Sequence, residues 1–136
     1  MKVSFTGTRQ GMSEWQKQQL DMWAWTNRNK LVQFSHGCCI GADVEAHLII
    51  RKRCENNVFI SVFPSTAKTR AEVPADANYI ALAKPPLERD KDIVDAGHDL
   101  LIAAPLLMKE FSRSGTWATV RYARKKKVPV LILWRD

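Results

Sequence analysis

Short apolar runs and longer helical stretches alternate along the chain. The strand-like runs are residues 2–6, 30–35, 57–63, 99–105 and 128–134, and helices are predicted at about 13–29, 42–55, 86–97 and 115–127. Strands that are apolar on both faces and separated by helices indicate a parallel sheet covered on both sides. We therefore predict an α/β fold: a single doubly wound, Rossmann-like domain over residues 1–136. Its core sheet should be mostly parallel and five-stranded, with residues 2–6 near the centre.

The first predicted helix begins at a recognisable signal. Ser13 and Gln16 have the spacing of a capping box. Trp15, Met22 and Trp23 then recur at helical spacing, which predicts that they pack in the core.

The longest irregular stretch covers residues 64–86 and is too long for an idle connection. We expect it to act as a lid or binding loop that carries a short extra strand.

The composition excludes several classes of protein. The chain has 136 residues, of which 46% are hydrophobic, and no apolar run reaches the roughly 18 residues that span a bilayer. Its N-terminus is not a signal peptide, so we expect a cytoplasmic protein without membrane contact. Cys38, Cys39 and Cys54 form neither a disulfide framework nor a zinc-site pattern. We predict reduced thiols, no metal site and no resident cofactor.

The net charge of +7, from 21 basic and 14 acidic residues, favours anionic partners. Such partners range from a mononucleotide to a nucleic acid strand. Much of the excess lies in residues 120–127, near a predicted helix C-terminus, where the helix dipole stabilises cations whatever the function. Charge alone therefore does not choose the ligand.

Glycine-bearing loops follow three of the predicted strands. After the first strand come Gly7, Thr8 and Arg9. Gly7 permits a tight turn, Thr8 can donate a hydroxyl hydrogen bond, and Arg9 can bind a phosphate through two N–H groups. Parallel strands direct their following loops to one edge of the sheet, so these residues should face a common cleft.

The second loop holds His36, Gly37, Gly41 and Asp43. Asp43 either caps the next helix or holds sugar hydroxyls. His36 is either a packed, turn-bonded histidine or a catalytic group. Both pairs of alternatives stay open at the level of sequence.

The third loop, after the fourth strand, holds Ser112, Ser114, Gly115 and Thr116 and opens a helix. Small residues let a ligand approach the backbone, and the helix start supplies free N–H groups. This arrangement predicts a phosphate-binding loop.

These motifs together resemble the SLOG superfamily, which includes the DNA-processing protein DprA (Smf) and the "lonely guy" phosphoribohydrolases. The resemblance runs through "FTGTR", "SHGCCIGADVEAH", "ERDKDIVDAGHDLLIAAP" and "SRSGTWATVRYARKKKVPV", and is greatest to the short YspA-like branch. It implies a nucleotide-binding domain over residues 1–136 that pairs into homo-oligomers through helix faces. It also implies that Arg89, in "LERDK", completes an anion clamp.

The catalytic part of the family pattern is altered. The phosphoribohydrolases carry Pro-Gly-Gly-x-Gly-Thr-x-x-Glu, whose glutamate is implicated in catalysis. Here Ser112 and Arg113 replace two glycines, and Thr119 stands where the glutamate would be. A threonine cannot act as a carboxylate base at neutral pH.

Three functions follow from these features. The first is a sensor or binding module for a nucleotide, or another ribose-phosphate-containing small molecule. Its site residues would be Gly7, Thr8, Arg9, His36, Gly37, Gly41, Asp43, Arg89, Ser112, Ser114, Gly115 and Thr116.

The second function is an N-glycosidase acting on nucleoside monophosphates. Its carboxylate would be one of Asp43, Glu45, Glu72, Asp76 or Glu88. The sequence does not choose among them.

The third function is DprA-like binding of single-stranded nucleic acid. Such proteins expose aromatic rings in basic grooves, whereas Trp15, Trp23 and Trp117 are predicted on buried helix faces. This prediction ranks the third function below the other two.

Overall fold

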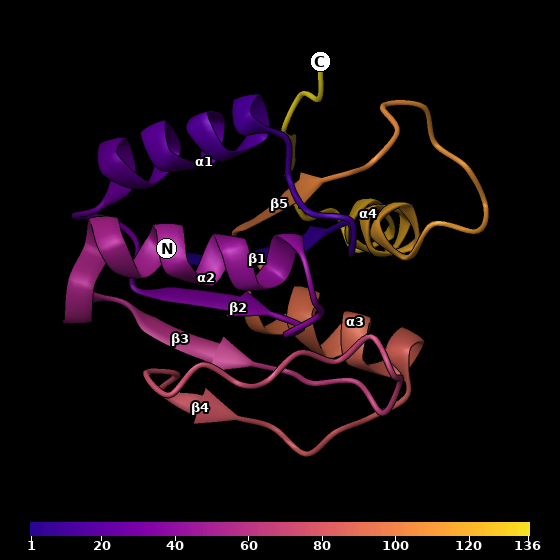
Figure 1. Ribbon diagram of the computed structural model, residues 1–136, viewed down its shortest axis with the longest axis horizontal. Helices are drawn as coiled ribbons and strands as arrows, with labels where there is room; N and C mark the ends of the chain where they lie inside the picture. Colours follow the sequence, from indigo (N-terminus) through magenta and orange to yellow (C-terminus); the bar gives the residue numbers. More distant parts are fainter.

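A six-stranded, wholly parallel sheet forms the centre of the computed structural model, which describes residues 1–136 (Figure 1). The strands are β1 (Lys2–Gly7), β2 (Gln33–His36), β3 (Phe59–Val62), β4 (Tyr79–Ile80), β5 (Leu100–Ala104) and β6 (Val130–Ile132). The helices are α1 (Glu14–Asn27), α2 (Ala42–Cys54), α3 (Pro86–Ala96) and α4 (Gly115–Lys125), with a 3₁₀ turn at Glu55–Asn57. None of these helices is long and apolar enough to span a membrane.

The strand order β4-β3-β2-β1-β5-β6 explains where a ligand can enter. The chain builds the sheet outward from β1 in one direction as far as β4, then returns to the other side of β1 to add β5 and β6. The loops that follow β1 and β5 therefore lead in different directions from the carboxyl ends of these two neighbouring strands. Ligands bind at this position in open α/β folds. The predicted doubly wound fold and the central place of β1 are confirmed.

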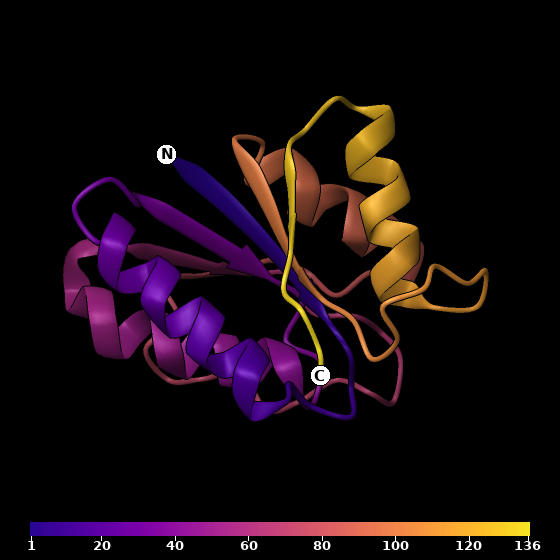
Figure 2. The ribbon, with the colours of Figure 1, turned by 90° about the horizontal axis from the view of Figure 1, so that it is seen from above.

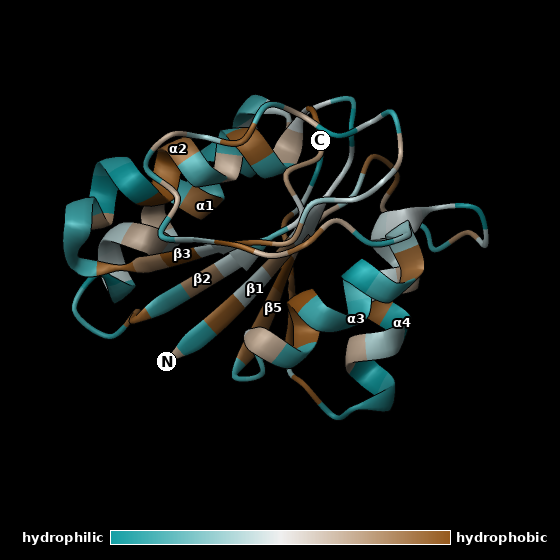
Figure 3. Cartoon of the chain, turned by 90° about the horizontal axis from the view of Figure 1, so that it is seen from below, coloured by the Kyte–Doolittle hydropathy of each residue, from teal (hydrophilic) through white to brown (hydrophobic).

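Helices cover both faces of the sheet: α1 and α2 lie on one side, and α3 and α4 lie on the other (Figures 2 and 3). Two apolar clusters fill the space between these layers. The larger includes Phe5, Phe34 and Ile50, and the smaller includes Leu101 and Trp117. The buried position predicted for Trp117 is confirmed.

The sheet has six strands and not the five predicted. The additional strand, β4, is two residues long and pairs with β3 at the edge of the sheet. It lies within residues 64–86, where a short extra strand was expected. Its side chains are exposed, so the burial pattern that marks the central strands is absent from it.

Helix α1 begins at the predicted capping box but buries a different face. The Ser13 hydroxyl accepts the Gln16 N–H at 3.1 Å, and the Gln16 side chain accepts the Ser13 N–H at 3.0 Å. However, Trp15 and Met22 are 43% and 63% exposed, and Trp23 is only partly buried. The prediction that Trp15 and Met22 belong to the core is wrong.

A buried polar residue accounts for this error. Gln16 is fully buried with Leu20 and Ala24, on the face of α1 that meets the sheet. Its side-chain amide donates to the carbonyl oxygens of Pro105 and Leu133, at 2.9 Å and 3.2 Å. These bonds offset the cost of burying the amide and keep Gln16 inward, which hydrophobic periodicity cannot detect.

Candidate functional site

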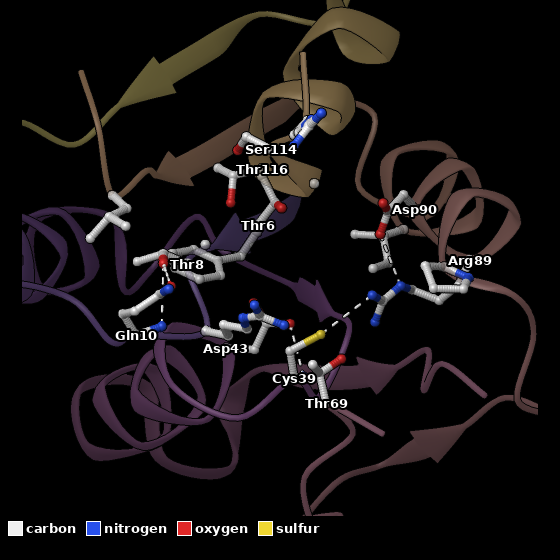
Figure 4. A pocket seen from close by; sticks show the side chains of 18 of the residues that line it. Thr6, Thr8, Gln10, Cys39, Asp43, Thr69, Arg89, Asp90, Ser114 and Thr116 are labelled. Atoms are coloured by element: carbon white, nitrogen blue, oxygen red, sulfur yellow. Dashed lines mark hydrogen bonds and ion pairs between the residues drawn. The ribbon is translucent and has the colours of Figure 1, made fainter. Parts of the chain in front are cut away.

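A cavity of about 480 Å³ lies at the carboxyl ends of β1 and β5 (Figure 4). It brings together eight of the residues predicted for the site. Gly7, Thr8 and Arg9 come from the loop after β1, Asp43 from the first turn of α2, Arg89 from α3, and Ser114, Gly115 and Thr116 from the start of α4.

Other predicted residues do not line this cavity. They are His36, Gly37, Gly41, Glu72, Glu88 and Ser112, of which Glu72, Glu88 and Ser112 are exposed. Glu45 and Asp76 have partners elsewhere: Glu45 accepts the Met12 N–H and pairs with Lys17, and Asp76 pairs with His47. Gly41 has a φ of +92° at the start of α2, so its role there is conformational.

The N-terminus of α4 opens into the cavity. The Ser114 hydroxyl caps the helix by accepting the Trp117 N–H at 3.2 Å, and Ala118 donates the first helical bond to the Ser114 carbonyl. The amides of Gly115 and Thr116 precede these bonds and have no acceptor within the helix. A Cβ atom placed on Gly115 would meet no atom within 4 Å. Gly115 is therefore not required for packing, and its missing side chain leaves the helix start accessible.

Two arginines of the cavity have no ion-pair partner. Arg9 and Arg113 both line the cavity, and both are exposed. Together with the partial positive charge of the helix start, they make the cavity suitable for an anion. The basic residues 121–127 lie toward the opposite end of α4 and do not line the cavity.

Asp43 places a buried carboxylate in the same cavity. Only 4% of the residue is exposed, and its Oδ2 accepts the Cys39 N–H at 3.1 Å. Its Oδ1 is buried without a hydrogen-bond partner. Burial raises the pKa of Asp43 to about 6, against the opposing effect of the Arg89 charge. Asp43 is not the N-cap of α2, which is Gly41, so its side chain is not committed to capping the helix.

Arg89 is a buried residue that links two elements of the fold, and it is not an exposed cation. It is 7% exposed, and one terminal nitrogen donates to the Gly37 carbonyl at 2.6 Å. Its other terminal nitrogen contacts the Cys39 sulfur at 3.3 Å, and its Nε lies 2.9 Å from Asp90 Oδ1. These contacts join α3 to the turn after β2. The anion clamp that the resemblance implied for Arg89 stays a prediction, and its guanidinium is already bonded to protein groups.

Asp90 is a cavity residue that the sequence analysis missed. Burial raises the pKa of its carboxyl group, against the opposing effect of the Arg89 charge. Thr119 is 1% exposed and donates to the Gly115 carbonyl at 3.0 Å. Neighbouring residues on a helix diverge by about 100°, so no helical spacing rule indicated that residues 89 and 90 both reach the cavity.

Cys39 and Thr69 also line the cavity without having been predicted there. The loop of residues 64–86 pairs with the turn after β2, because Ile40 donates to the Thr69 carbonyl at 2.9 Å. This pairing brings Thr69 beside Cys39 (Figure 4). The contact links residues about 30 positions apart and leaves no local signal in the sequence.

His36 belongs to a buried chain of hydrogen bonds behind the site. Its Nδ1 accepts the Cys38 N–H at 3.0 Å, so its Nε2 carries the proton and donates to His47 Nδ1 at 2.9 Å. His47 Nε2 then donates to Asp76 Oδ1 at 2.7 Å. Burial lowers the pKa of His36 to about 3 and lowers that of His47. Of the two readings of His36, this geometry is that of the packed, turn-bonded histidine.

The fold resembles those of several solved structures. A molybdenum cofactor binding protein from the phototrophic bacterium Rippkaea orientalis matches with a TM-score of 0.72 at 18% identity, covering 98% of this chain and 76% of that one. The Moco carrier protein from Chlamydomonas reinhardtii matches with a TM-score of 0.63 at 16% identity, covering 96% and 74%. DNA processing protein A from Helicobacter pylori, described in its single-stranded DNA binding mode, gives a TM-score of 0.66 at 17% identity, covering 100% and 66%.

No sequence-family model and no curated protein sequence matches the chain. The structural matches are below 25% identity and define the class of fold. They confirm the SLOG-type fold that the sequence motifs indicated. The greater resemblance to the YspA-like branch stays a prediction.

Proposed function

We propose that this protein binds a nucleotide or a related phosphorylated small molecule in the cavity between the β1 and β5 loops, as a sensor or binding module. The observation that carries this proposal is the pairing of two unlike features. One is the open start of α4, in a cavity that Arg9 and Arg113 also line, and the other is the unpartnered Oδ1 of Asp43. A ligand with an anionic group and nearby hydroxyl donors satisfies both.

The size and position of the cavity support this proposal. Its volume of about 480 Å³ lies within the range of small-molecule sites, roughly 300–1,000 Å³. Proteins of the same fold bind a molybdenum cofactor or single-stranded DNA. The phosphate would accept bonds from the Gly115 and Thr116 amides, while sugar hydroxyls would donate to Asp43.

Gly115→Ala tests the phosphate position without disturbing the fold. Its methyl group meets nothing within 4 Å, so the melting temperature should stay the same or rise slightly. The same methyl group blocks the approach of a phosphate to the helix start. We expect affinity for nucleoside monophosphates and ribose 5-phosphate to fall about tenfold or more, as when charge-assisted hydrogen bonds are lost.

Ser112→Ala is the matched control, because Ser112 is exposed in the same loop and does not line the cavity. Ligand binding can be followed by thermal shift, since a ligand at about 100 times its Kd stabilises the fold by about 2.7 kcal/mol. Equal affinity in the Gly115→Ala and wild-type proteins would contradict the proposal. So would a wild-type protein that none of these phosphates stabilises.

An N-glycosidase remains the second candidate, because Asp43 and Asp90 bring two carboxyl groups into one cavity. We expect the wild-type protein to release little free base from nucleoside monophosphates. Thr119 is buried and bonded to its own helix, and Arg89 holds Asp90 in an ion pair. Chromatography of the released base measures the rate. General-base catalysis raises such a rate by about 10²–10⁴-fold, so a catalytic protein would be detected above background. Rapid release that Asp43→Asn or Asp90→Asn abolishes would favour the enzyme.

Binding of single-stranded nucleic acid is the third candidate, and the structure removes one argument against it. Trp15, Trp25 and Trp134 are 43%, 51% and 63% exposed, although Trp15 was expected to be buried. None of the three lines the cavity. A nucleic acid strand bound through many of its phosphates would lose affinity steeply as the salt concentration rises. A ligand bound through one phosphate would show a shallow salt dependence.

A further inference from the structure

One side of the cavity is apolar and forms what we call the apolar wall. It belongs to residues 105–114, the loop between β5 and α4. Leu106 and Phe111 from this loop both line the cavity. Figure 1 shows the loop projecting beside α4. Phe111 retains 38% of its surface exposed, so a large part of its ring is free to contact a bound molecule.

The loop is held in place at two points between Leu106 and Phe111. The buried Trp117 donates from its indole nitrogen to the Leu107 carbonyl at 3.0 Å. Glu110, which directly precedes Phe111, pairs with Arg121 of α4 at 2.9 Å. These bonds position Phe111 before a ligand arrives, which lowers the entropic cost of binding against it.

We propose that Phe111 is a specificity-determining residue that packs against the planar base of the phosphorylated ligand, with Leu106 completing the apolar wall. This inference rests on the proposed function, since it takes the phosphate to lie at the start of α4. Phe111 is four residues before Gly115, so the wall and the phosphate position belong to one continuous segment. A free sugar phosphate satisfies the polar part of this cavity alone, whereas a nucleotide also covers the wall.

The experiment compares ribose 5-phosphate with the four common ribonucleoside 5′-monophosphates, using calorimetry on the wild-type and Phe111→Ala proteins. In the wild type, at least one nucleotide should bind about tenfold more tightly than ribose 5-phosphate, as expected for one base packed on an aromatic ring. Phe111→Ala should remove this advantage and leave the affinity for ribose 5-phosphate unchanged. Phe111→Tyr, which keeps the ring, should retain it.

Leu107→Ala is the matched control, because Leu107 is 52% exposed in the same loop and its side chain does not line the cavity. It should leave both affinities unchanged. A loss of ribose 5-phosphate binding in Phe111→Ala would overturn the inference, because Phe111 would then act through the shape of the loop.

The outcomes also separate the inference from the proposed function. If the wild type binds ribose 5-phosphate and every nucleotide equally, the inference is overturned and the phosphate site stands. If the wild type binds neither ribose 5-phosphate nor any of the nucleotides, the inference and the proposed function both fail. If it binds only a thymidine oligonucleotide, with a steep loss of affinity in salt, the ligand is a nucleic acid strand and both fail in their present form.

Discussion

Replacing Arg89 with alanine should lower the free energy of unfolding by about 3–5 kcal/mol, the usual cost of removing one partner of a buried ion pair. The substitution leaves Asp90, which is largely buried, without its counter-charge at 2.9 Å. It also leaves the Gly37 carbonyl without its donor at 2.6 Å. A domain of this size should then melt at least about 10 °C lower, which calorimetry or circular dichroism would detect.

Arg113→Ala is the control for this prediction, since Arg113 lines the same cavity but is exposed and has no ion-pair partner. Its free energy of unfolding should stay within about 0.5 kcal/mol of the wild type. Arg113→Ala should instead weaken phosphate binding, in a protein whose stability is that of the wild type. An Arg89→Ala protein that melts with the wild type would show that the buried contacts of Arg89 contribute little.

The buried contacts of Arg89 depend on Gly37, a residue that does not itself line the cavity. A Cβ atom on Gly37 would lie 2.2 Å from one terminal nitrogen of Arg89 and 3.1 Å from Asp43 Oδ2. The missing side chain therefore makes room for the guanidinium and the carboxylate together. Gly37 was predicted to contact the ligand, whereas in the structure it lies behind the cavity lining and leaves space for Arg89 and Asp43.

The fold could be predicted because its signals are local. Each central strand is a short apolar run, and each helix lies where the period changes, so α2 was expected at 42–55 and is found at Ala42–Cys54. The edge strand β4 was harder to define, because its two exposed residues carry no burial pattern. The face of α1 was mispredicted for a related reason, since the inward position of Gln16 depends on carbonyl groups about 90 and 117 residues away.

The candidate site was predictable only where a loop directly follows a strand. The topology carries Gly7 and Gly115 to the same edge of the sheet, and both line the cavity. Asp90 and Thr69 reach it through the packing of α3 and the pairing of a long loop, which no spacing rule describes. The sequence motifs therefore indicated the phosphate side of the cavity better than its acidic side.

The chain from His36 through His47 to Asp76 should make the protein lose stability in acid. Burial lowers the pKa of His36 to about 3, whereas an unfolded histidine titrates near 6.5. Between these values the unfolded chain takes up a proton that the native state does not. The free energy of unfolding should therefore fall, as pH decreases from about 6.5, by about 1.4 kcal/mol per pH unit from His36. His47, whose pKa is also lowered, adds to the same loss.

Asp43 and Asp90 change the free energy of unfolding in the direction opposite to His36. Asp76 changes it in the same direction as His36, but at lower pH. The pKa values of Asp43 and Asp90 are raised by burial, so these groups take up protons in the native state first and add stability as pH falls toward about 4. The pKa of Asp76 is lowered by its bond to His47, so its contribution is lost as pH falls below about 4. The net slope of the wild type therefore mixes contributions of both signs, and a difference between two proteins is needed to isolate His36.

His36→Asn supplies that difference. The asparagine oxygen can take the place of Nδ1 and accept the Cys38 N–H, so the bond to the turn after β2 can persist without a titrating ring. Urea unfolding at pH 7, 6, 5 and 4 should show the variant losing less stability in acid than the wild type. The gap between the two free energies of unfolding should change by about 1.4 kcal/mol per pH unit below pH 6. Parallel pH profiles would mean that His36 takes up its proton in the folded protein as readily as in the unfolded chain. The hydrogen-bonded chain would then not be what excludes that proton.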